Sequence, residues 1–277
     1  ALDEAAPGRG YTSFGGPGFS PKSGTLGGWA PGNESVPTPS GVGMLLPKGA
    51  DIVLQVHYHK SGKPEEDLTK IGLTFCKGPI DKRMRVLPVL YLPLRIPAGD
   101  SKYMAHTNVT IPTDITVHSV TPHMHLLARE MLVTATLPDE STKKLVRVPD
   151  WDFNWQTTYA FKQPVTLPAG SKIEVEARYD NSTGNPLNPN NPPKQVHWGE
   201  ETTDEMCIAF LRYTVDSEHL TRGQVAQDAP DSMGSGGFAG NQMRLLRQVM
   251  EMFDEDKDGR INTEEGKDMA DFIRKNN

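Results

Sequence analysis

Apolar and polar residues alternate along much of the chain between residues 51 and 215, the pattern of strands with one buried face. In the segment 173–179, Ile173 and every second residue after it are apolar or aromatic, whereas the residues between them are charged. Within the segment 51–59, apolar or aromatic residues at every second position from Ile52 to Tyr58 alternate with Val53, Gln55, His57 and His59. Further strands are predicted at 71–76, 103–111, 115–121, 130–137, 144–148, 157–166 and 205–214. Many short strands separated by turns predict a mainly β protein built as a sandwich.

Four other stretches depart from this alternation. Residues 1–50 are rich in Gly, Pro and Ser and predict irregular loops over a neighbouring body. Residues 180–203 are rich in Pro and Asn, and a loop of this length within a compact domain usually has a function. Residues 217–242 are polar and Gly/Ser-rich, which predicts a flexible linker. Residues 243–277 place apolar side chains at helical spacing and predict a small α-helical segment.

Within the helical segment, residues 254–265 have the pattern of an EF-hand calcium loop. Carboxylates at the first, third and fifth positions, a glycine at the sixth and a glutamate at the twelfth supply the oxygen ligands and the sharp turn that Ca²⁺ requires. The expected ligands are Asp254, Asp256, Asp258, the backbone carbonyl of Arg260, Asn262 through a water molecule, and Glu265. The alternative is a charged helix–turn–helix that binds no ion. The complete set of ligand positions favours calcium.

Length, charge and cysteine content narrow the class of protein. The chain has 277 residues, which suggests about two domains. Its net charge of −6 and its lack of a long basic run argue against a nucleic-acid partner. The longest apolar run, residues 86–94, contains two prolines and is too short to span a bilayer. The two cysteines, Cys76 and Cys207, are compatible with one disulfide or with two free thiols.

Four histidines form two pairs with one residue between them, His57/His59 and His123/His125. Residues two apart in a strand point to the same face, so each pair can bring two imidazoles to one metal ion. The alternative for each pair is a surface feature with satisfied hydrogen bonds. Met206 lies further along the chain, and a site with two imidazoles and a thioether would favour copper, especially Cu(I).

Three colinear segments resemble the copper type II, ascorbate-dependent monooxygenases, which include peptidylglycine α-hydroxylating and dopamine β-monooxygenases. The segments are 25–59, with the motif LQVHYH, 115–132, with PHMH, and 197–213, with DEMC. The stretches LPKGADIVLQVHYH and YDNSTGNPLNPNNPP are most similar to bacterial members. The resemblance implies two jelly-roll-like β-sandwich domains with one copper in each. The first, N-terminally truncated, would occupy residues 1–86 and the second residues 87–216.

The resemblance also implies roles for particular residues. His123, His125 and Met206 match the ligands of the copper that binds oxygen and hydroxylates substrate. His57 matches one ligand of the electron-transfer copper, whereas His59 has no counterpart ligand in the family. The complete enzyme would therefore use two coppers, with ascorbate as the reductant.

The sequence departs from the family pattern in three places. The electron-transfer copper also needs an adjacent His-His pair, and this chain has no such dipeptide. The peptide-amidating branch binds its substrate with an arginine and a tyrosine, and this chain has Thr121 and Phe210 at those positions. Thr121 and Phe210 are therefore only weak candidates for substrate binding. Without the ion pair and the phenolic hydrogen bond, peptidylglycine is a doubtful substrate. The half-cystine that would pair with Cys207 falls near Tyr179, so that disulfide is absent.

From these observations we expect a copper monooxygenase that inserts one oxygen atom of O2 into an aliphatic C–H bond of a small molecule. We expect an extracytoplasmic location, no membrane span, and additional domains in a longer parent protein, since the chain starts at Ala1 without a targeting segment. One alternative is a calcium-responsive copper-binding or interaction module that keeps the fold without turnover. Another is a copper-storage protein with no substrate.

Overall fold

The structure, a computed structural model, describes residues 10–11, 25–59 and 61–226. The predicted calcium loop and helical segment, as well as most of the predicted linker, lie outside the described residues. The part that is described is mainly β, with one short 3₁₀ helix, η1 (Leu220–Arg222). No helix in it is long and apolar enough to cross a membrane.

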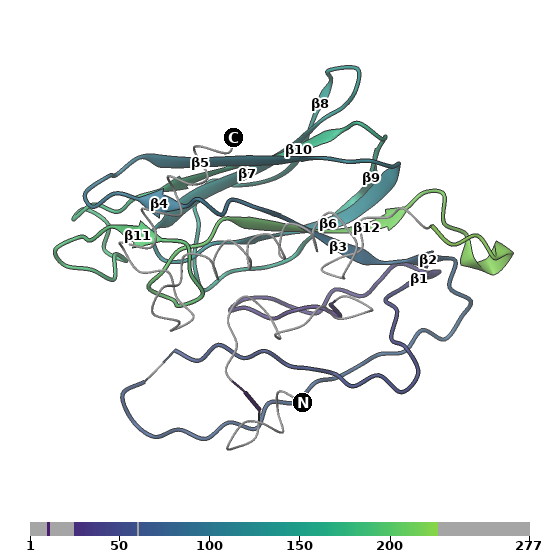
Figure 1. The fold of residues 1–277 in the computed structure, drawn as a ribbon, viewed down its shortest axis with the longest axis horizontal. Coiled ribbons are helices and arrows are strands. Elements are labelled where there is room, and N and C mark those ends of the chain that lie inside the picture. The colour runs from purple at the N-terminus through teal and green to yellow at the C-terminus, as the bar shows by residue number, and fades with distance from the viewer. Residues whose placement is uncertain (1–9, 12–24, 60, 227–277) are drawn as a thin grey trace.

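Two four-stranded sheets form the body of the protein (Figure 1). The first sheet runs in the order β5 (Tyr103–Thr110), β10 (Lys172–Tyr179), β7 (Ala128–Thr136) and β8 (Thr142–Val148). The second runs in the order β3 (Arg85–Leu90), β12 (Ile208–Val215), β6 (Ile115–His123) and β9 (Tyr159–Leu167). All neighbouring strands within the two sheets are antiparallel.

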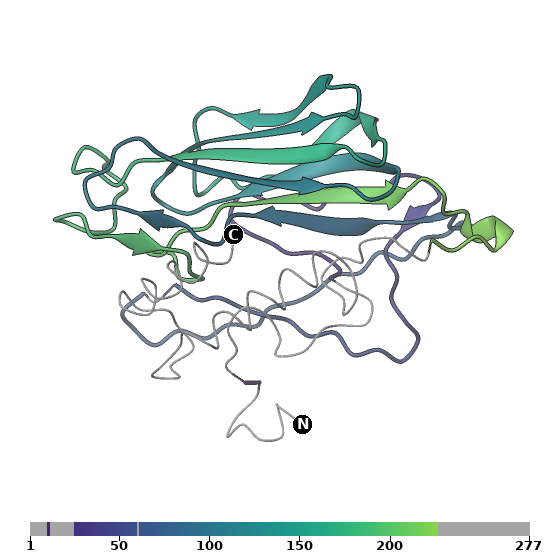
Figure 2. The same cartoon turned by 45° about the horizontal axis from the view of Figure 1, so that its top comes forward.

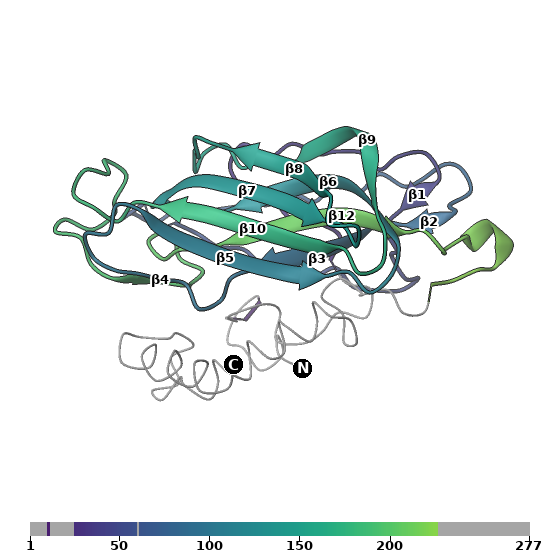
Figure 3. The same ribbon diagram turned by 90° about the horizontal axis from the view of Figure 1, so that it is seen from above.

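The two sheets stack as the layers of a sandwich (Figures 2 and 3). Their inner faces share one hydrophobic core, in which Val175 of β10 and Leu211 of β12 are both fully buried. The charged residues that alternate with the core positions of β10, such as Glu176, face solvent. Burial of one face of each sheet therefore follows the period-two pattern of the sequence.

Seven predicted strands are confirmed, with different end residues. They are the strands predicted at 103–111, 115–121, 130–137, 144–148, 157–166, 173–179 and 205–214. The strand β3 was not expected, because its six residues are all buried and the sequence there shows no alternation. Its Pro88 is compatible with the position of β3 at the edge of its sheet, where one side needs no hydrogen-bond donor.

The strands predicted at 51–59 and 71–76 are wrong. Both segments are extended chain without a sheet partner in the described part, and their side chains are exposed. In Figure 1 this region runs beside the β3-β12-β6-β9 sheet, on the side away from the first sheet. An alternating sequence becomes a strand only when another strand satisfies its backbone groups, and none does so here. The two-sandwich arrangement is therefore seen only in part, as one sandwich.

Two short ladders attach the flanking segments to the sandwich. β1 (Val42–Gly43) pairs in parallel with β2 (Lys82–Arg83), and β4 (Arg95–Ile96) pairs antiparallel with β11 (Val196–His197).

A buried ion pair holds the end of the second sheet. The carboxylate of Glu218 is fully buried and accepts hydrogen bonds from both terminal nitrogens of Arg85, at 3.0 and 2.9 Å. It also accepts the backbone N–H of Arg83 at 2.7 Å. The ammonium group of Lys82 donates to the backbone carbonyls of Asp216 and Glu218, at 2.8 and 2.9 Å. These contacts fix the chain after β12 against β2 and β3.

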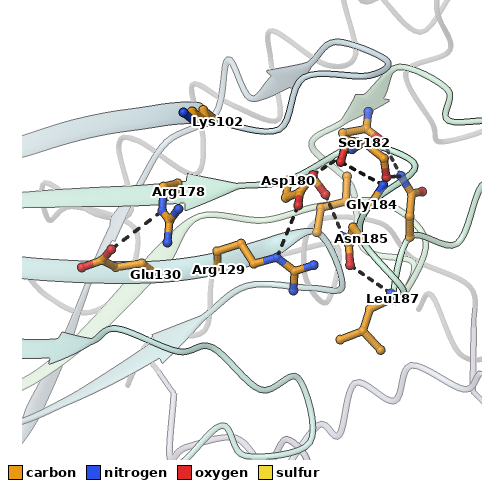
Figure 4. A network of polar contacts seen from close by, with 12 residues as sticks. Lys102, Arg129, Glu130, Arg178, Asp180, Ser182, Gly184, Asn185 and Leu187 are labelled. Carbon is orange, nitrogen blue, oxygen red and sulfur yellow. Dashed lines mark hydrogen bonds and ion pairs between the residues drawn. The ribbon is translucent and has the colours of Figure 1, made fainter.

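The long Pro- and Asn-rich loop after β10 is organised by its own side chains (Figure 4). The carboxylate of Asp180 accepts the backbone N–H of Ser182 at 2.9 Å and lies 3.9 Å from the guanidinium of Arg129. The Asn185 amide donates to the backbone carbonyl of Asp180 and accepts the N–H of Leu187. Such side-chain contacts to neighbouring backbone groups give the loop a defined path. Its predicted functional role stays a prediction.

Candidate metal centre

The histidine pair lies at the end of the second sheet. His123 is the last residue of β6, and His125 follows two residues later. Their ring centroids are 5.3 Å apart and the ring planes are nearly perpendicular, at 82°. His125 is buried and His123 is partly covered. The structure therefore brings together the two imidazoles that the spacing predicts to share a face.

One nitrogen of each imidazole is bound to an oxygen acceptor. Nδ1 of His123 lies 2.7 Å from Oε1 of Gln156, whose amide nitrogen in turn donates to the carbonyl of Phe153 at 2.9 Å. Nδ1 of His125 lies 3.1 Å from the carbonyl oxygen of Asp204. Because these oxygens only accept, both Nδ1 atoms carry the proton, and the lone pair of each neutral ring is on Nε2. This is the tautomer in which a histidine binds a metal through Nε2.

The electrostatic environment keeps both rings neutral. Burial lowers the pKa of His123, against the hydrogen bond that its Nδ1–H donates to Gln156, which favours the charged form. Burial and the neighbouring His123 lower the pKa of His125 to about 3. At neutral pH each ring therefore keeps its lone pair for a ligand bond rather than for a proton.

Glu205 connects the segment of His125 with that of Met206. Its Oε1 atom accepts the backbone N–H of His125 and that of Met206, the latter at 2.9 Å, and its Oε2 atom accepts the N–H of Leu127 at 2.9 Å. Glu205 is fully buried, and burial raises its pKa to about 8. The backbone carbonyl of the same residue, Met206, accepts a hydrogen bond from the hydroxyl of Tyr179 at 2.8 Å. No local pattern in the sequence indicates either contact.

Met206 itself is almost buried, at 8% exposure, and packs with Leu90 and Ile208. Ile208 is opposite His123 in the register of β12 and β6, so the start of β12 brings the chain of Met206 to the histidine pair. In residues 25–59 and 61–226, no three His, Cys, Asp or Glu side chains are grouped as metal ligands. The donor set that the sequence predicts here, two imidazoles with a thioether, is one that suits copper.

His57 lies near this pair, although it comes from the segment that forms no strand. Its Nδ1 atom is 3.4 Å from the carbonyl of Glu200, in the chain that leads to Met206. A positive charge on His57 would lower the pKa of both His123 and His125. His57 is exposed, as is its neighbour in the sequence pair, His59.

The two weak candidates for substrate binding, Thr121 and Phe210, are opposite each other in the register of β6 and β12. The hydroxyl of Thr121 forms a hydrogen bond with that of Thr158 at 2.8 Å. The Phe210 ring lies 6.3 Å from the ring of His123, between centroids. Phe153 stands edge-on to His125, at 6.1 Å. Aromatic rings thus flank both imidazoles.

The loop between β8 and β9, residues 149–158, contributes more to the site than its sequence indicates. It supplies Gln156 and Phe153, and its Trp151 donates the indole N–H to the carbonyl of His125 at 3.0 Å. Spacing along the chain gives no signal for such contacts, because the loop and the histidines meet only through the sandwich.

Both cysteines are free thiols, Cys76 exposed and Cys207 buried. Burial raises the pKa of Cys207 to about 12, so it is protonated at neutral pH. Tyr179, the residue near which the family's half-cystine would fall, donates its hydroxyl to the carbonyl of Met206, the residue before Cys207. Cys76 and Cys207 therefore form no disulfide with each other.

Solved structures with a similar arrangement are remote. The infectious bursal disease virus VP2 subviral particle gives a TM-score of 0.22 at 12% identity, covering 75% of this chain and 59% of that chain. The dimeric latent PorU from Porphyromonas gingivalis gives 0.22 at 8% identity, covering 53% and 14%. Likenesses at this level carry no argument about function.

Sequence comparisons are more informative. Residues 101–230 match the family described as copper type II ascorbate-dependent monooxygenase, C-terminal domain. The chain is 25% identical to the DBH-like monooxygenase protein 1 of Gallus gallus and 26% identical to that of Homo sapiens, in each case over 76% of this chain and 36% of the relative. It thus spans about a third of the length of these curated relatives. The sandwich of this chain is thus similar to the C-terminal domain of copper type II ascorbate-dependent monooxygenases and to DBH-like monooxygenase proteins.

Proposed function

We propose that this chain is part of a copper-dependent monooxygenase that hydroxylates an aliphatic C–H bond. The observation that carries the proposal is the pair of neutral imidazoles of His123 and His125, whose ring centroids are 5.3 Å apart and whose Nδ1 atoms are both bound to oxygen acceptors, so that each lone pair is on Nε2. The reaction is balanced when substrate, O2, two electrons and two protons give the hydroxylated substrate and water. Ascorbate supplies the electrons one at a time.

His123, His125 and Met206 would hold the copper that binds oxygen. Copper at this position supplies one-electron redox chemistry and the reduction of O2, and a thioether ligand favours its Cu(I) state. Gln156 and the carbonyl of Asp204 keep the two imidazoles in the metal-binding tautomer. His57 would belong to the electron-transfer copper.

The surroundings of the pair favour an apolar substrate. Phe210 and Phe153 flank the two imidazoles, and the hydroxyl of Thr121 is already bound to Thr158. Positions 121 and 210 therefore offer neither a cation for a substrate carboxylate nor a phenol. We propose a small molecule whose reacting aliphatic carbon is attached to an apolar or aromatic skeleton.

The remaining parts of the proposal rest on the sequence. Residues 254–265 would bind Ca²⁺ in an EF-hand, the chain would be of the bacterial type, and the protein would act outside the cytoplasm as part of a longer chain. Calcium titration of the full chain, with Glu265→Gln as the variant, tests the first of these, because loss of the bidentate ligand should weaken binding.

Copper K-edge X-ray absorption on the ascorbate-reduced protein tests the copper site. We expect a sulfur scatterer at bonding distance in the wild type, and its loss in Met206→Ala. Met104→Ala is the matched control, because Met104 is 57% exposed on a strand of the other sheet. Only nitrogen and oxygen scatterers in all three proteins would contradict the proposed ligand set.

A second candidate function is copper binding without turnover. Absence of an adjacent His-His pair from the full-length protein would favour it, because His57 would then have no partner ligands for an electron-transfer copper. Oxygen consumption distinguishes the two functions. Ascorbate oxidation by the copper-loaded protein, with no hydroxylated product from any apolar substrate tested, would support binding alone.

A further inference from the structure

A tight turn far from the histidines in sequence binds the β8–β9 loop. Residues 30–33 form a turn closed by a hydrogen bond from the N–H of Asn33 to the carbonyl of Ala30, at 3.0 Å. Pro31 and Gly32, the latter with φ of +79°, occupy the central positions, as in a type II turn. The carbonyl of Pro31 accepts the backbone N–H of Gln156 at 2.8 Å.

The contact at Gly32 leaves no room for a side chain. A Cβ atom at this position would lie 2.6 Å from the carbonyl oxygen of Asn154 and 2.7 Å from Cα of Trp155. Both are backbone atoms, so the loop itself would have to move to admit a methyl group. The next residue of the turn, Asn33, accepts a hydrogen bond from the hydroxyl of Thr158 at 3.2 Å. Successive residues of the turn therefore hold the loop on both sides of Gln156.

Gln156 is the residue that binds Nδ1 of His123. Its backbone is fixed by Pro31 and its side-chain amide by the carbonyl of Phe153, so its Oε1 atom has a defined position. We propose that the turn 30–33 is a positioning element for His123, and that Gly32 acts on the metal site through Gln156. This inference rests on the proposed copper function. It adds Gly32, a residue outside the sandwich, to the residues that position the histidines of the metal site.

The first test measures Cu(I) affinity by competition with a chromogenic Cu(I) chelator. Loss of a contact that orients a metal-binding histidine typically weakens metal binding by about 10–100-fold. We expect Gly32→Ala and Gln156→Ala each to weaken Cu(I) binding within that range. The double variant should bind no more weakly than Gln156→Ala alone, because both changes break the same connection.

Gly41→Ala is the matched control. Gly41 also has a positive φ, of +74°, but no atom lies within 4 Å of the position that its Cβ would take. It therefore imposes the same backbone strain without the clash, and we expect Cu(I) binding within about twofold of the wild type. Equal losses in Gly32→Ala and Gly41→Ala would overturn the proposal, since strain in the segment would then explain both. Additive losses in the double variant would also overturn it.

The second test needs no metal. Imidazole ¹⁵N NMR of the metal-free protein reports the tautomer of His123, which we expect to be protonated at Nδ1 in the wild type and in Gly41→Ala. In Gly32→Ala and Gln156→Ala, the His123 signals should move toward a mixture of tautomers. Unchanged signals in Gly32→Ala would refute the positioning role. Failure of the wild type to bind Cu(I), with the tautomer changes as expected, would refute the proposed function alone.

Discussion

The segments 172–179 and 51–59 both have apolar or aromatic residues at every second position, yet only the first is a strand. β10 lies between β5 and β7 and is hydrogen-bonded on both sides, and its Ile173 is fully buried. The segment 51–59 has no partner strand in the described residues, and Ile52 and Val53, on opposite faces, are 43% and 51% exposed. Alternation thus identifies a chain that can form a strand, and neighbouring strands decide whether it does.

Truncation of the matched isoleucines should show the largest difference between the two regions. Ile173→Ala removes a buried side chain from the middle of the core, and we expect it to lower the free energy of unfolding by about 4 kcal/mol. Ile52→Ala should change it by less than about 0.5 kcal/mol, because the side chain is already in contact with water. Urea unfolding, with equal m-values required for the comparison, measures both.

A loss of more than about 2 kcal/mol in Ile52→Ala would contradict the structure of this segment, because only a buried side chain produces an effect of that size. The segment 51–59 would then be a true strand whose partner the described residues do not include. The sequence-based prediction of a strand at 51–59 would then be correct, and the two segments would both be strands.

Ion pairs give the next comparison. The Arg85–Glu218 pair has both side chains buried, whereas Lys63 and Glu65, 3.3 Å apart, have side chains that are 71% and 60% exposed. Glu218→Gln should cost about 3 kcal/mol, since it removes the negative charge opposite a buried guanidinium. Glu65→Gln should cost less than about 1 kcal/mol. Thermal unfolding at constant pH measures both, and equal effects would mean that the buried pair is exposed in solution.

The same pair predicts a pH dependence. Burial alone would raise the pKa of Glu218, but the hydrogen bonds from Arg85 and from the N–H of Arg83 outweigh it and hold the pKa below its usual range. The folded value is therefore lower than the value in the unfolded chain, about 4.3. The stability that the pair provides is complete above pH 4.3 and is lost as the pH falls through the folded pKa. Unfolding free energies between pH 7 and pH 3 should fall less steeply for Glu218→Gln than for the wild type.

Much of the fold could be predicted from the sequence, because every second residue of a sandwich strand faces the core and is therefore apolar. Seven strands were found in this way. β3 was not, since an edge strand that is buried on both faces has no alternation, and 51–59 was predicted wrongly, since alternation carries no information about the partner. Prediction failed wherever the structure depended on what lies beside a segment rather than on the segment itself.

The site shows the same division. The spacing of His123 and His125 predicts that their rings lie close together, and the ring centroids are 5.3 Å apart, although β6 ends at His123 and the strand periodicity does not extend to His125. The contacts that set their tautomers come from Gln156 and from the carbonyl of Asp204, which are distant in sequence or belong to the backbone. The role of Glu205 as a common acceptor is likewise a property of the folded chain, because no local pattern distinguishes it from a surface carboxylate.

Two tyrosines give the smallest expected difference, and they bring the comparison to the metal site. Tyr179, the last residue of β10, is fully buried and donates its hydroxyl proton to the carbonyl of Met206. Tyr58 is 68% exposed and donates to the carboxylate of Asp67 at 2.8 Å. Tyr179→Phe should lower the free energy of unfolding by about 1–2 kcal/mol, because it leaves a buried carbonyl without that donor, and Tyr58→Phe by less than about 0.5 kcal/mol. Chemical denaturation of both variants measures the difference. An unchanged free energy of unfolding in Tyr179→Phe would mean that this hydrogen bond does not stabilise the backbone at Met206.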